Sequence, residues 1–541
     1  MESATQAPVD RKADHGTRES RCERCARSEE ENAALRAKVA ELAKAKAKLE
    51  AKLKLREDQL FGRKTEQEPK PASKSVPESD STGSGAESTD GAKRKRKRGG
   101  QKGAKGHGRR NHDHLPSITV EHDFLDEEKC CGHCKTPYKE FPGTEDSVQI
   151  EIEIRVIRTV HERKRYQPQC DCAGSPRIIT APGPAKLIPK GLLGTSLWVL
   201  VLLDKFLFQR PTYRLLADLK THGLDLSQAT LTSGMRRLAP LFDPILAGIH
   251  AKNIEENHWH ADETRWLVFV DVEGKEGHRW WLWVFRSKSA VEYVLSPWRA
   301  ASVPEEHYGP DANGVISADR YAVYKKLAKS GRFKIAFCWA HTRRDFVNLG
   351  KSYPQHVPWA QYWIDTIGEL YRINGLRRAA LQAKDARAES AAKKKLCSLL
   401  KEMVKIRDDE LADRDIPEER AKVLTRLLDH WDGLILFLDD AWIPMDNNEA
   451  ERLLRNPVVG RKNYYGSGAV WSGQFAATLF SVFQTLQIWG LNPRLWLRSY
   501  FDACAASGGK PPSNIEDFLP WTMSEETRRS LAAINSDSEV A

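Results

Sequence analysis

Four apolar runs between residues 258 and 346 constrain the fold more than any other feature of the sequence. The first two, WHADETRWLVFVDV and HRWWLWVFRS, are rich in aromatic and β-branched residues and are separated by a glycine-containing turn. This pattern is typical of a hairpin of two buried strands. The other two, GVISADRYAVYKKL and FKIAFCWAHTRRDF, each continue into a helical pattern. Strands that alternate with helices predict an α/β sheet.

Three carboxylates occupy unusual positions in and after these runs. Asp262 lies inside the first run, Asp319 follows the apolar part of the third, and Glu451 lies on a predicted helix opened by Pro444 and Asp446. A carboxylate among apolar neighbours is costly to bury unless it meets a cation. Two strand carboxylates and one helix carboxylate can hold two divalent ions for in-line phosphoryl chemistry, and oxygen ligands favour Mg²⁺ or Mn²⁺. The alternative is structural, because a strand-end aspartate often caps a turn and a helical glutamate is often solvated.

The positive charge of the chain is concentrated in one segment. The net charge is +11, and residues 93–110 contain ten Lys and Arg and no acid, so the rest of the chain is close to neutral. The segment follows a Ser/Pro/Gly/Glu-rich linker at 66–92, and its glycines favour an arm that follows a phosphate backbone. Solvated charge without a partner, or a localisation signal, is the alternative. The residues predicted to contact DNA here are Lys93, Arg94, Lys95, Arg96, Lys97 and Arg98.

Residues 29–60 carry a heptad pattern. Leu35, Leu42 and Leu49 fall on d positions, and Val39 and Leu53 fall on a positions. Such a pattern predicts a coiled coil and self-association. A lone amphipathic helix that docks elsewhere on the chain would give the same pattern.

The ten cysteines indicate a metal site more than a disulfide framework. The first residues lack the layout of a signal peptide, so we expect an intracellular chain with reduced cysteines. Cys131 and Cys134 form a CxxC, and Cys170 and Cys172 form a CxC beyond an alternating stretch, SVQIEIEIRVIRTVHERKRY, that predicts strands. Two such pairs can close a structural tetrahedral Zn²⁺ site in a zinc-ribbon-like unit. The adjacent Cys130 could replace Cys131, and reduced structural cysteines are the alternative.

Residues 190–250 have a helical pattern. Pro211 suits a helix start, Gly223 a stop and Ser227 an N-cap, which gives a helix-turn-helix-like arrangement before an arginine-bearing helix. Any packing of three helices would look similar. The longest apolar run, Leu192–Leu203, is too short to cross a membrane, so no membrane partner is expected.

The order of the motifs resembles that of the insertion-sequence-66 family of transposases, which are bacterial DDE enzymes. The resemblance covers nearly the whole chain. It rests on LFGRKTE, RKRGGQKGAKGHGRR, HADETRW, SADRYAVY, CWAHTRRDF and DNNEAERLLRNPVVGRKNYYG. It implies an RNase H-like catalytic domain in which Asp262, Asp319 and Glu451 hold Mg²⁺ or Mn²⁺. Glu449, two residues earlier, points about 200° away on a helix, so only one of the two glutamates can face the metals.

The resemblance also implies an activity. A DNA transposase would cut the ends of its insertion sequence and join the 3′-hydroxyl ends to target DNA by two-metal phosphoryl transfer. Planar guanidinium groups suit phosphate, so we expect DNA-backbone contacts near the site. The residues predicted for these contacts are Arg343, Arg344, Arg452, Arg455, Arg461 and Lys462.

We therefore expect a multidomain α/β protein. The predicted parts are an oligomerisation helix at 1–65, a linker and basic arm at 66–110, a zinc-ribbon-like domain at 111–180, a helix-turn-helix-like domain at 185–250, a catalytic domain at 255–490 with a helical insertion at about 360–440, and a C-terminal region at 491–541. The partners implied are double-stranded DNA, a second copy of the chain and small accessory proteins, in the bacterial cytoplasm near the nucleoid. Two other functions remain open, a resolvase-like nuclease on the same fold and a non-catalytic DNA-binding regulator.

Overall fold

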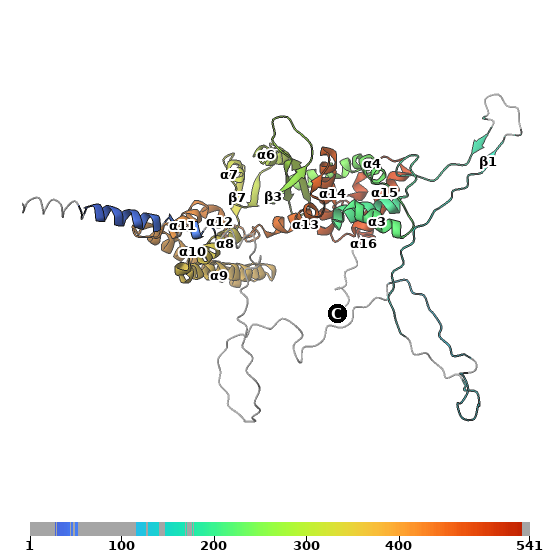
Figure 1. The fold of residues 1–541 in the computed structure, drawn as a ribbon, viewed down its shortest axis with the longest axis horizontal. Helices are drawn as coiled ribbons and strands as arrows, with labels where there is room; N and C mark the ends of the chain where they lie inside the picture. Colours follow the sequence, from blue (N-terminus) through green and yellow to red (C-terminus); the bar gives the residue numbers. More distant parts are fainter. Residues whose placement is uncertain are drawn as a thin grey trace, which may run out of the picture. The chain divides into compact units, whose positions relative to one another are not determined.

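The computed structural model describes residues 178–532 continuously, most of 115–167, residues 169 and 176, and parts of 28–53 (Figure 1). The chain divides into two compact units. The first comprises Met1–Pro77, Ser317–Lys325 and Lys334–Asn447, and the second comprises Glu78–Ile316, Lys326–Phe333 and Asn448–Ala541. Each unit is described by itself below.

A six-stranded sheet organises the chain after residue 258. Its order is β5-β4-β3-β6-β7, and the short β8 pairs with β3 in parallel. The strands β3, β4 and β5 pair antiparallel, and the β3–β4 pair is the hairpin that the first two apolar runs predict. Because β8 pairs in parallel, the sheet is mixed, and the fold is α/β. The bounds are His258–Val268 for β3, Arg279–Arg286 for β4, Val291–Ser296 for β5, Gly314–Ala318 for β6, Phe333–Phe337 for β7 and Gly466–Ser467 for β8.

The register gives the sheet two chemically different faces. Asp262 lies opposite Val284 and His260 lies opposite Arg286, so these residues share one face. Ala261 and Glu292 both lie opposite Phe285, and they share the other face. The two faces therefore position separate groups of polar side chains.

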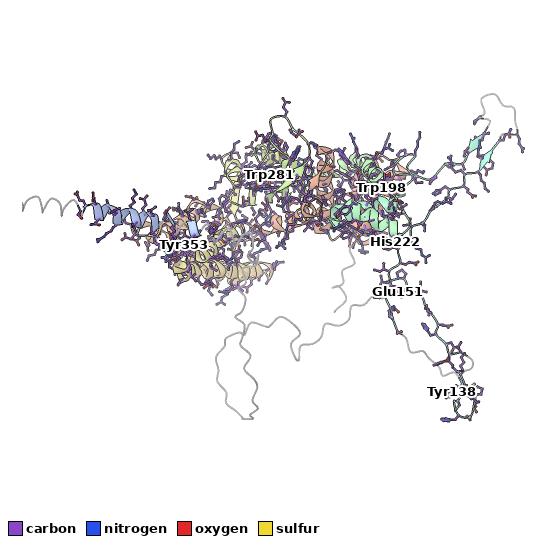
Figure 2. The ribbon with its side chains drawn as sticks, viewed as in Figure 1. Tyr138, Glu151, Trp198, His222, Trp281 and Tyr353 are labelled. Carbon is purple, nitrogen blue, oxygen red and sulfur yellow. The ribbon has the colours of Figure 1, made fainter. Side chains whose placement is uncertain are left out.

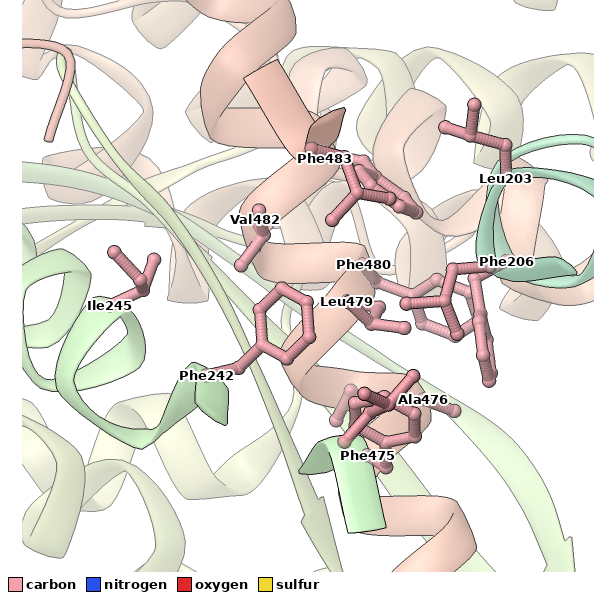
Figure 3. Close-up of a cluster of buried hydrophobic side chains, with 14 of the residues drawn as sticks. Leu203, Phe206, Phe242, Ile245, Phe475, Ala476, Leu479, Phe480, Val482 and Phe483 are labelled. Atoms are coloured by element: carbon pink, nitrogen blue, oxygen red, sulfur yellow. The ribbon is translucent and has the colours of Figure 1, made fainter. Parts of the chain in front are cut away.

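Helices of the second unit enclose its hydrophobic core. They are α2 Thr195–Leu202, a π-helical turn Leu203–Leu207, α3 Thr212–Thr221, α4 Gln228–Leu238, α5 Asp243–Ile254, α6 Ser302–Tyr308, α13 Asn448–Tyr464, α14 Val470–Ile488, α15 Pro493–Ala506 and α16 Glu525–Ser530. The apolar helix α14 lies at the centre, where Phe475 and Phe480 contact Phe206 edge-on (Figure 3). Trp496 and Tyr500 of α15 are fully buried in the same core, so the chain beyond residue 491 contributes to it.

The helix signals between residues 190 and 250 are confirmed. Helix α3 begins directly after Pro211, and Gly223 takes φ +82° in the turn that follows. The Ser227 hydroxyl accepts a hydrogen bond from the Thr230 amide at the start of α4. Residues that favour caps and turns thus fix both helices locally.

The first unit contains a helical core of its own. Its elements include α8 Trp339–Ser352, α9 Val357–Gln382, α10 Ala386–Ala412, α11 Glu418–Asp429 and α12 Trp431–Leu434, and α7 Ala322–Ala328 begins in this unit. Trp363 stacks on Phe346 in the interior. The helical pattern expected for residues 360–440 is therefore present.

The predictions for the chain before residue 167 have different outcomes. The described residues between 28 and 53 are helical, and Leu35, Val39 and Leu42 are more than half exposed. The strands predicted over the alternating stretch 147–166 are wrong except at β1 Arg165–Tyr166, which pairs with β2 Ile179–Thr180. An alternating segment gains little from forming a strand when its apolar side chains stay uncovered, and here Val148 and Ile152 are about 90% exposed. The side chains of Tyr138 and Glu151 extend from a backbone without regular structure (Figure 2).

None of the described helices is long and apolar enough to cross a membrane.

Candidate catalytic site

Asp262 lies at the centre of β3, on a half-buried position. Its Oδ1 accepts a hydrogen bond from the amide of Glu263 at 2.8 Å. Glu263 points to the opposite face, where the Arg299 guanidinium binds its carboxylate at 2.8 Å. Alternation along the strand therefore separates the two neighbouring acids, and only Asp262 is on the face that carries His260 and Arg286.

Helix α13 packs along the same face of β3. At its start, Glu449 lies 2.8 Å from the Nε of Arg286 and 3.9 Å from the Nε2 of His260. Near its end, Arg461 donates a hydrogen bond to the Thr264 hydroxyl at 3.2 Å. Asp262 lies in sequence between these two anchoring points, His260 and Thr264, and on their side of the sheet. The helix therefore brings its first turn, with Glu451, to the strand that carries Asp262.

The two glutamates of this first turn have different surroundings. Arg286 compensates the charge of Glu449, whereas Glu451 is half-buried beside the core residues Ala450 and Leu454. Sequence analysis did not identify His260 and Arg286 as partners of Glu449. Alternation along β3 places His260 on the face of Asp262, but only the register of β3 with β4 brings Arg286 to that face. The choice of Glu451 over Glu449 as the metal ligand stays a prediction, and this ion pair supports it.

Asp319 belongs to the first unit and follows β6 directly. Its Oδ1 accepts a hydrogen bond from the amide of Tyr321 at 2.9 Å, which closes a turn at the strand end. The neighbouring Arg320 binds Asp345 of α8 at 2.6 Å. Asp319 is half-buried, as expected for a carboxylate at the end of a strand.

Cys338, the N-cap residue of α8, is a buried thiol in the same unit. Its sulfur accepts a hydrogen bond from the amide of Asn447 at 3.3 Å, and burial raises its pKa. This contact fixes the chain immediately before α13.

The basic residues predicted to contact DNA differ in their surroundings. Arg344, Arg452, Arg455 and Lys462 are exposed, and Arg343 is half-buried. Arg461 also donates to the carbonyl of Arg265, and burial, with the charge of Arg265, lowers its pKa. Arg461 therefore holds α13 on β3, which is a structural task. Lys93, Arg94, Lys95, Arg96, Lys97 and Arg98 lie outside the described residues.

Hydrogen bonds tie α13 to the π-helical turn that precedes α3. Gln209 is 1% exposed with φ +58°, and its side-chain oxygen accepts from the Tyr464 hydroxyl at 2.6 Å. Its backbone carbonyl accepts from Asn463 at 2.8 Å, and Asn456 donates to the carbonyl of Leu207 at 3.3 Å. Gly460 has to be small here, because a Cβ would lie 2.0 Å from the Gln209 oxygen. The π-helical turn and α13 are thus firmly joined.

A cavity of about 350 Å³ opens beside this junction. Lys205, Tyr464, Trp266 and Trp471 line it together with residues of α3, α4 and the first turn of α14. The Lys205 ammonium lies 4.4 Å from the centre of the Tyr464 ring, and burial lowers its pKa to about 8. A cation beside aromatic rings is chemistry suited to phosphates and bases.

Half of the proposed zinc unit is described. The amides of Cys134 and His133 donate to the sulfur of Cys131 and lower its pKa to about 7. This turn is closed by a hydrogen bond from the Lys135 amide to the Cys131 carbonyl at 2.9 Å. A thiolate stabilised by backbone amides fits a metal ligand, which favours Cys131 over Cys130. Cys170 and Cys172 lie outside the described residues.

Comparison with known proteins identifies the family. A family profile described as "Transposase IS66 family" matches residues 190–475, more than half of the chain. The chain belongs to the IS66 family of transposases. Membership supports a transposase role and implies binding of DNA and use of a divalent metal ion.

Curated relatives occur in Sinorhizobium fredii (strain NBRC 101917 / NGR234). Uncharacterized protein y4jD is 28% identical over 76% of this chain and 82% of its own length, and uncharacterized protein y4hP is 28% identical over 75% and 74%. Uncharacterized protein y4qI is 26% identical over 70% and 71%. No solved structure matches the chain.

Proposed function

We propose that this IS66-family transposase is a DDE enzyme that cuts the ends of its insertion sequence and joins the 3′-hydroxyl ends to target DNA. The observation that carries the proposal is the placement of Asp262 on the strand face against which α13, with Glu451, is packed. The antiparallel β3-β4-β5 edge, followed by β6 and β7 with their helices, supports an RNase H-like catalytic domain.

The donor set fits hard divalent cations. Asp262, Asp319 and Glu451 offer only carboxylate oxygens, the ligands that Mg²⁺ and Mn²⁺ prefer. When bound, two such ions supply activation of the attacking oxygen and stabilisation of charge on the scissile phosphate. Arg286 keeps Glu449 away from this role by holding it in an ion pair. The Arg461 contacts with β3 fix the orientation of the helix that carries Glu451.

DNA contacts complete the proposal. The exposed guanidinium and ammonium groups of Arg344, Arg452, Arg455 and Lys462 are positioned to bind phosphates without reading sequence. We also assign phosphate contacts to Arg343 and to the basic arm that begins at Lys93. Structural zinc on Cys131, Cys134, Cys170 and Cys172, and self-association through the helix that carries Leu35 and Leu42, are further parts of the same proposal.

The decisive experiment is an end-cleavage and strand-transfer assay. Purified protein is incubated with a labelled duplex that carries the terminal repeat of the element, with Mg²⁺ or Mn²⁺, with and without the small proteins encoded beside it. Nicking at the repeat boundary is expected for the wild type, and its loss is expected for Asp319→Asn, whose binding to the duplex without metal should be unchanged. A matched control is Asp311→Asn, an exposed loop acid before β6.

Two outcomes would contradict the proposal. Equal nicking by wild type and Asp319→Asn would remove that residue from the site. Binding without nicking in every mixture would favour a DNA-binding regulator, and preferential cutting of four-way junctions would favour a resolvase.

A further inference from the structure

A second polar cluster lies on the face of the sheet opposite Asp262. It consists of His250 on α5, Glu292 on β5 and His307 on α6, and one nitrogen or oxygen atom of each lies within 4.8 Å of the others. Glu292 and His307 are buried, whereas the His250 side chain is 38% exposed. Glu292 lies opposite Phe285, and the His307 ring stacks on Phe285 at 3.9 Å. The cluster is therefore separate from the candidate catalytic site.

The hydrogen bonds of Asn253 determine which ring nitrogen of His307 carries a hydrogen. The Asn253 amide nitrogen donates to the carbonyls of Phe285 and Ala290 at 3.0 and 3.1 Å, so its oxygen faces the Nε2 of His307 at 3.0 Å. Because an amide oxygen only accepts, Nε2 has to carry a hydrogen. In a neutral ring the lone pair then resides on Nδ1.

This lone pair faces another acceptor. The Nδ1 of His307 lies 3.6 Å from the Oε2 of Glu292 and has no hydrogen-bond partner among the described residues. A doubly protonated ring would satisfy both atoms, but it would place a charge on a ring that is 5% exposed and stacked on Phe285. His250 directs its Nδ1 to the same carboxylate oxygen at 2.8 Å. Three potential ligand atoms thus converge on one point.

We propose that His250, Glu292 and His307 form a binding site for a divalent transition metal ion of the Zn²⁺ class. Two imidazole nitrogens and one carboxylate are a common zinc donor set. Ligands about 2.0 Å from a tetrahedral ion lie about 3.3 Å from each other, and the two observed separations bracket this value. Metal binding requires only that His250 releases the hydrogen it shares with Glu292.

The surroundings resemble those of metal sites. The hydrogen bond from His307 Nε2 to Asn253 orients the ring and raises the basicity of the opposite nitrogen, as outer partners of ligating histidines do. The partly exposed His250 gives an entry path and leaves a fourth position for water. Bound metal would fasten α5 and α6 to the edge strand β5.

The test compares zinc content and thermal stability in the full-length chain. The background variant Cys131→Ser weakens the proposed cysteine site, and His250→Ala and Glu292→Gln are added to it. The control is His278→Ala, which removes an exposed histidine outside the cluster. After dialysis against Zn²⁺, we expect the background and the control to hold about one zinc ion more per chain than either cluster variant. Added Zn²⁺ should raise the melting temperature of the background and the control, and should do so less for His250→Ala.

X-ray absorption of the zinc-loaded background gives a second readout that needs no cluster variant. Imidazole and oxygen scattering is expected there. Equal zinc content in the background and His250→Ala, or a zinc spectrum without imidazole scattering, would overturn the proposal and leave a buried hydrogen-bonded cluster. If Glu292→Gln fails to fold, His250→Ala and the spectrum still decide the question.

Discussion

The contrast between Glu449 and Glu451 is the sharpest test of the catalytic assignment. The residues are two positions apart on α13, and we expect the change Glu449→Gln to act on stability and Glu451→Gln to act on catalysis. The reason is that Glu449 is engaged by Arg286 at 2.8 Å, whereas we assign Glu451 to the metal ions.

The size of the Glu449 effect follows from its ion pair. At an effective dielectric constant near 20, two charges 4 Å apart interact by about 4 kcal/mol. The side chains of Arg286 and Glu449 are 23% and 38% exposed, so solvent screening reduces the net contribution to about 1 kcal/mol. A loss of this size lowers the melting temperature by about 2 °C in a large domain. The cleavage rate should stay within about threefold of the wild type.

The Glu451 effect should be of a different kind. Even the loss of an outer partner of a metal ligand lowers metal affinity or activity by about 10- to 100-fold, so the loss of the ligand itself should reduce nicking by at least about 100-fold. The melting temperature should change little in the absence of metal. The assays are nicking at the terminal repeat over a Mn²⁺ titration and thermal denaturation of both variants. If Glu449→Gln abolished nicking while Glu451→Gln preserved it, with both proteins folded, the assignment of the two glutamates would be reversed.

Three further predictions concern packing, protonation and metal. Gly234→Ala should destabilise the second unit by about 1–3 kcal/mol, because the new Cβ would lie 1.9 Å from the Trp198 ring. Gly368→Ala, on an exposed turn of α9 with no atom within 4 Å of the new Cβ, should instead stabilise the first unit by up to about 1 kcal/mol. Chemical denaturation compares the two variants. Lys205→Met should be more stable than the wild type at pH 7, and this difference in stability should shrink as the pH rises from about 8 towards 10. In that pH range the lysine of the unfolded chain still binds a proton that the buried lysine of the folded chain has released. Equal pH profiles of the two proteins in thermal melts would contradict the burial argument. After removal of metal by a chelator, Cys131 should react with iodoacetamide with a midpoint near pH 7, and Zn²⁺ should protect it; mass spectrometry of the labelled peptides measures both.

The sequence predicted local structure where the deciding interaction is local. The Ser227 cap and the start of α3 after Pro211 depend on neighbours within a few residues, and both are present. The helix that carries Glu451 was expected to open at Pro444 and Asp446, but α13 begins at Asn448. The amide of the preceding Asn447 donates to the sulfur of Cys338, which is 109 residues away in the chain.

The sequence predictions failed where a structure depends on contacts between residues that are far apart in the chain. The alternation over 147–166 predicts strands, yet only Arg165–Tyr166 forms one, because alternation does not say whether a covering layer exists. The pairing of Glu449 with Arg286 joins residues far apart in the chain and could not be deduced from spacing. For the candidate site, residue type and position suggested the acids, the family motifs selected among them, and the assignment stays a prediction.

The bonds around Gln209 have a consequence for engineering. One engineering strategy is to exchange residues 190–238 between this chain and a relative. The buried Gln209 joins that segment to Tyr464 and Asn463, near the end of the helix that carries Glu451. A chimera that exchanged residues 190–238 without residues 456–464 would change one side of these hydrogen bonds and not the other. Residues 190–238 and 456–464 should therefore be exchanged together, as one block.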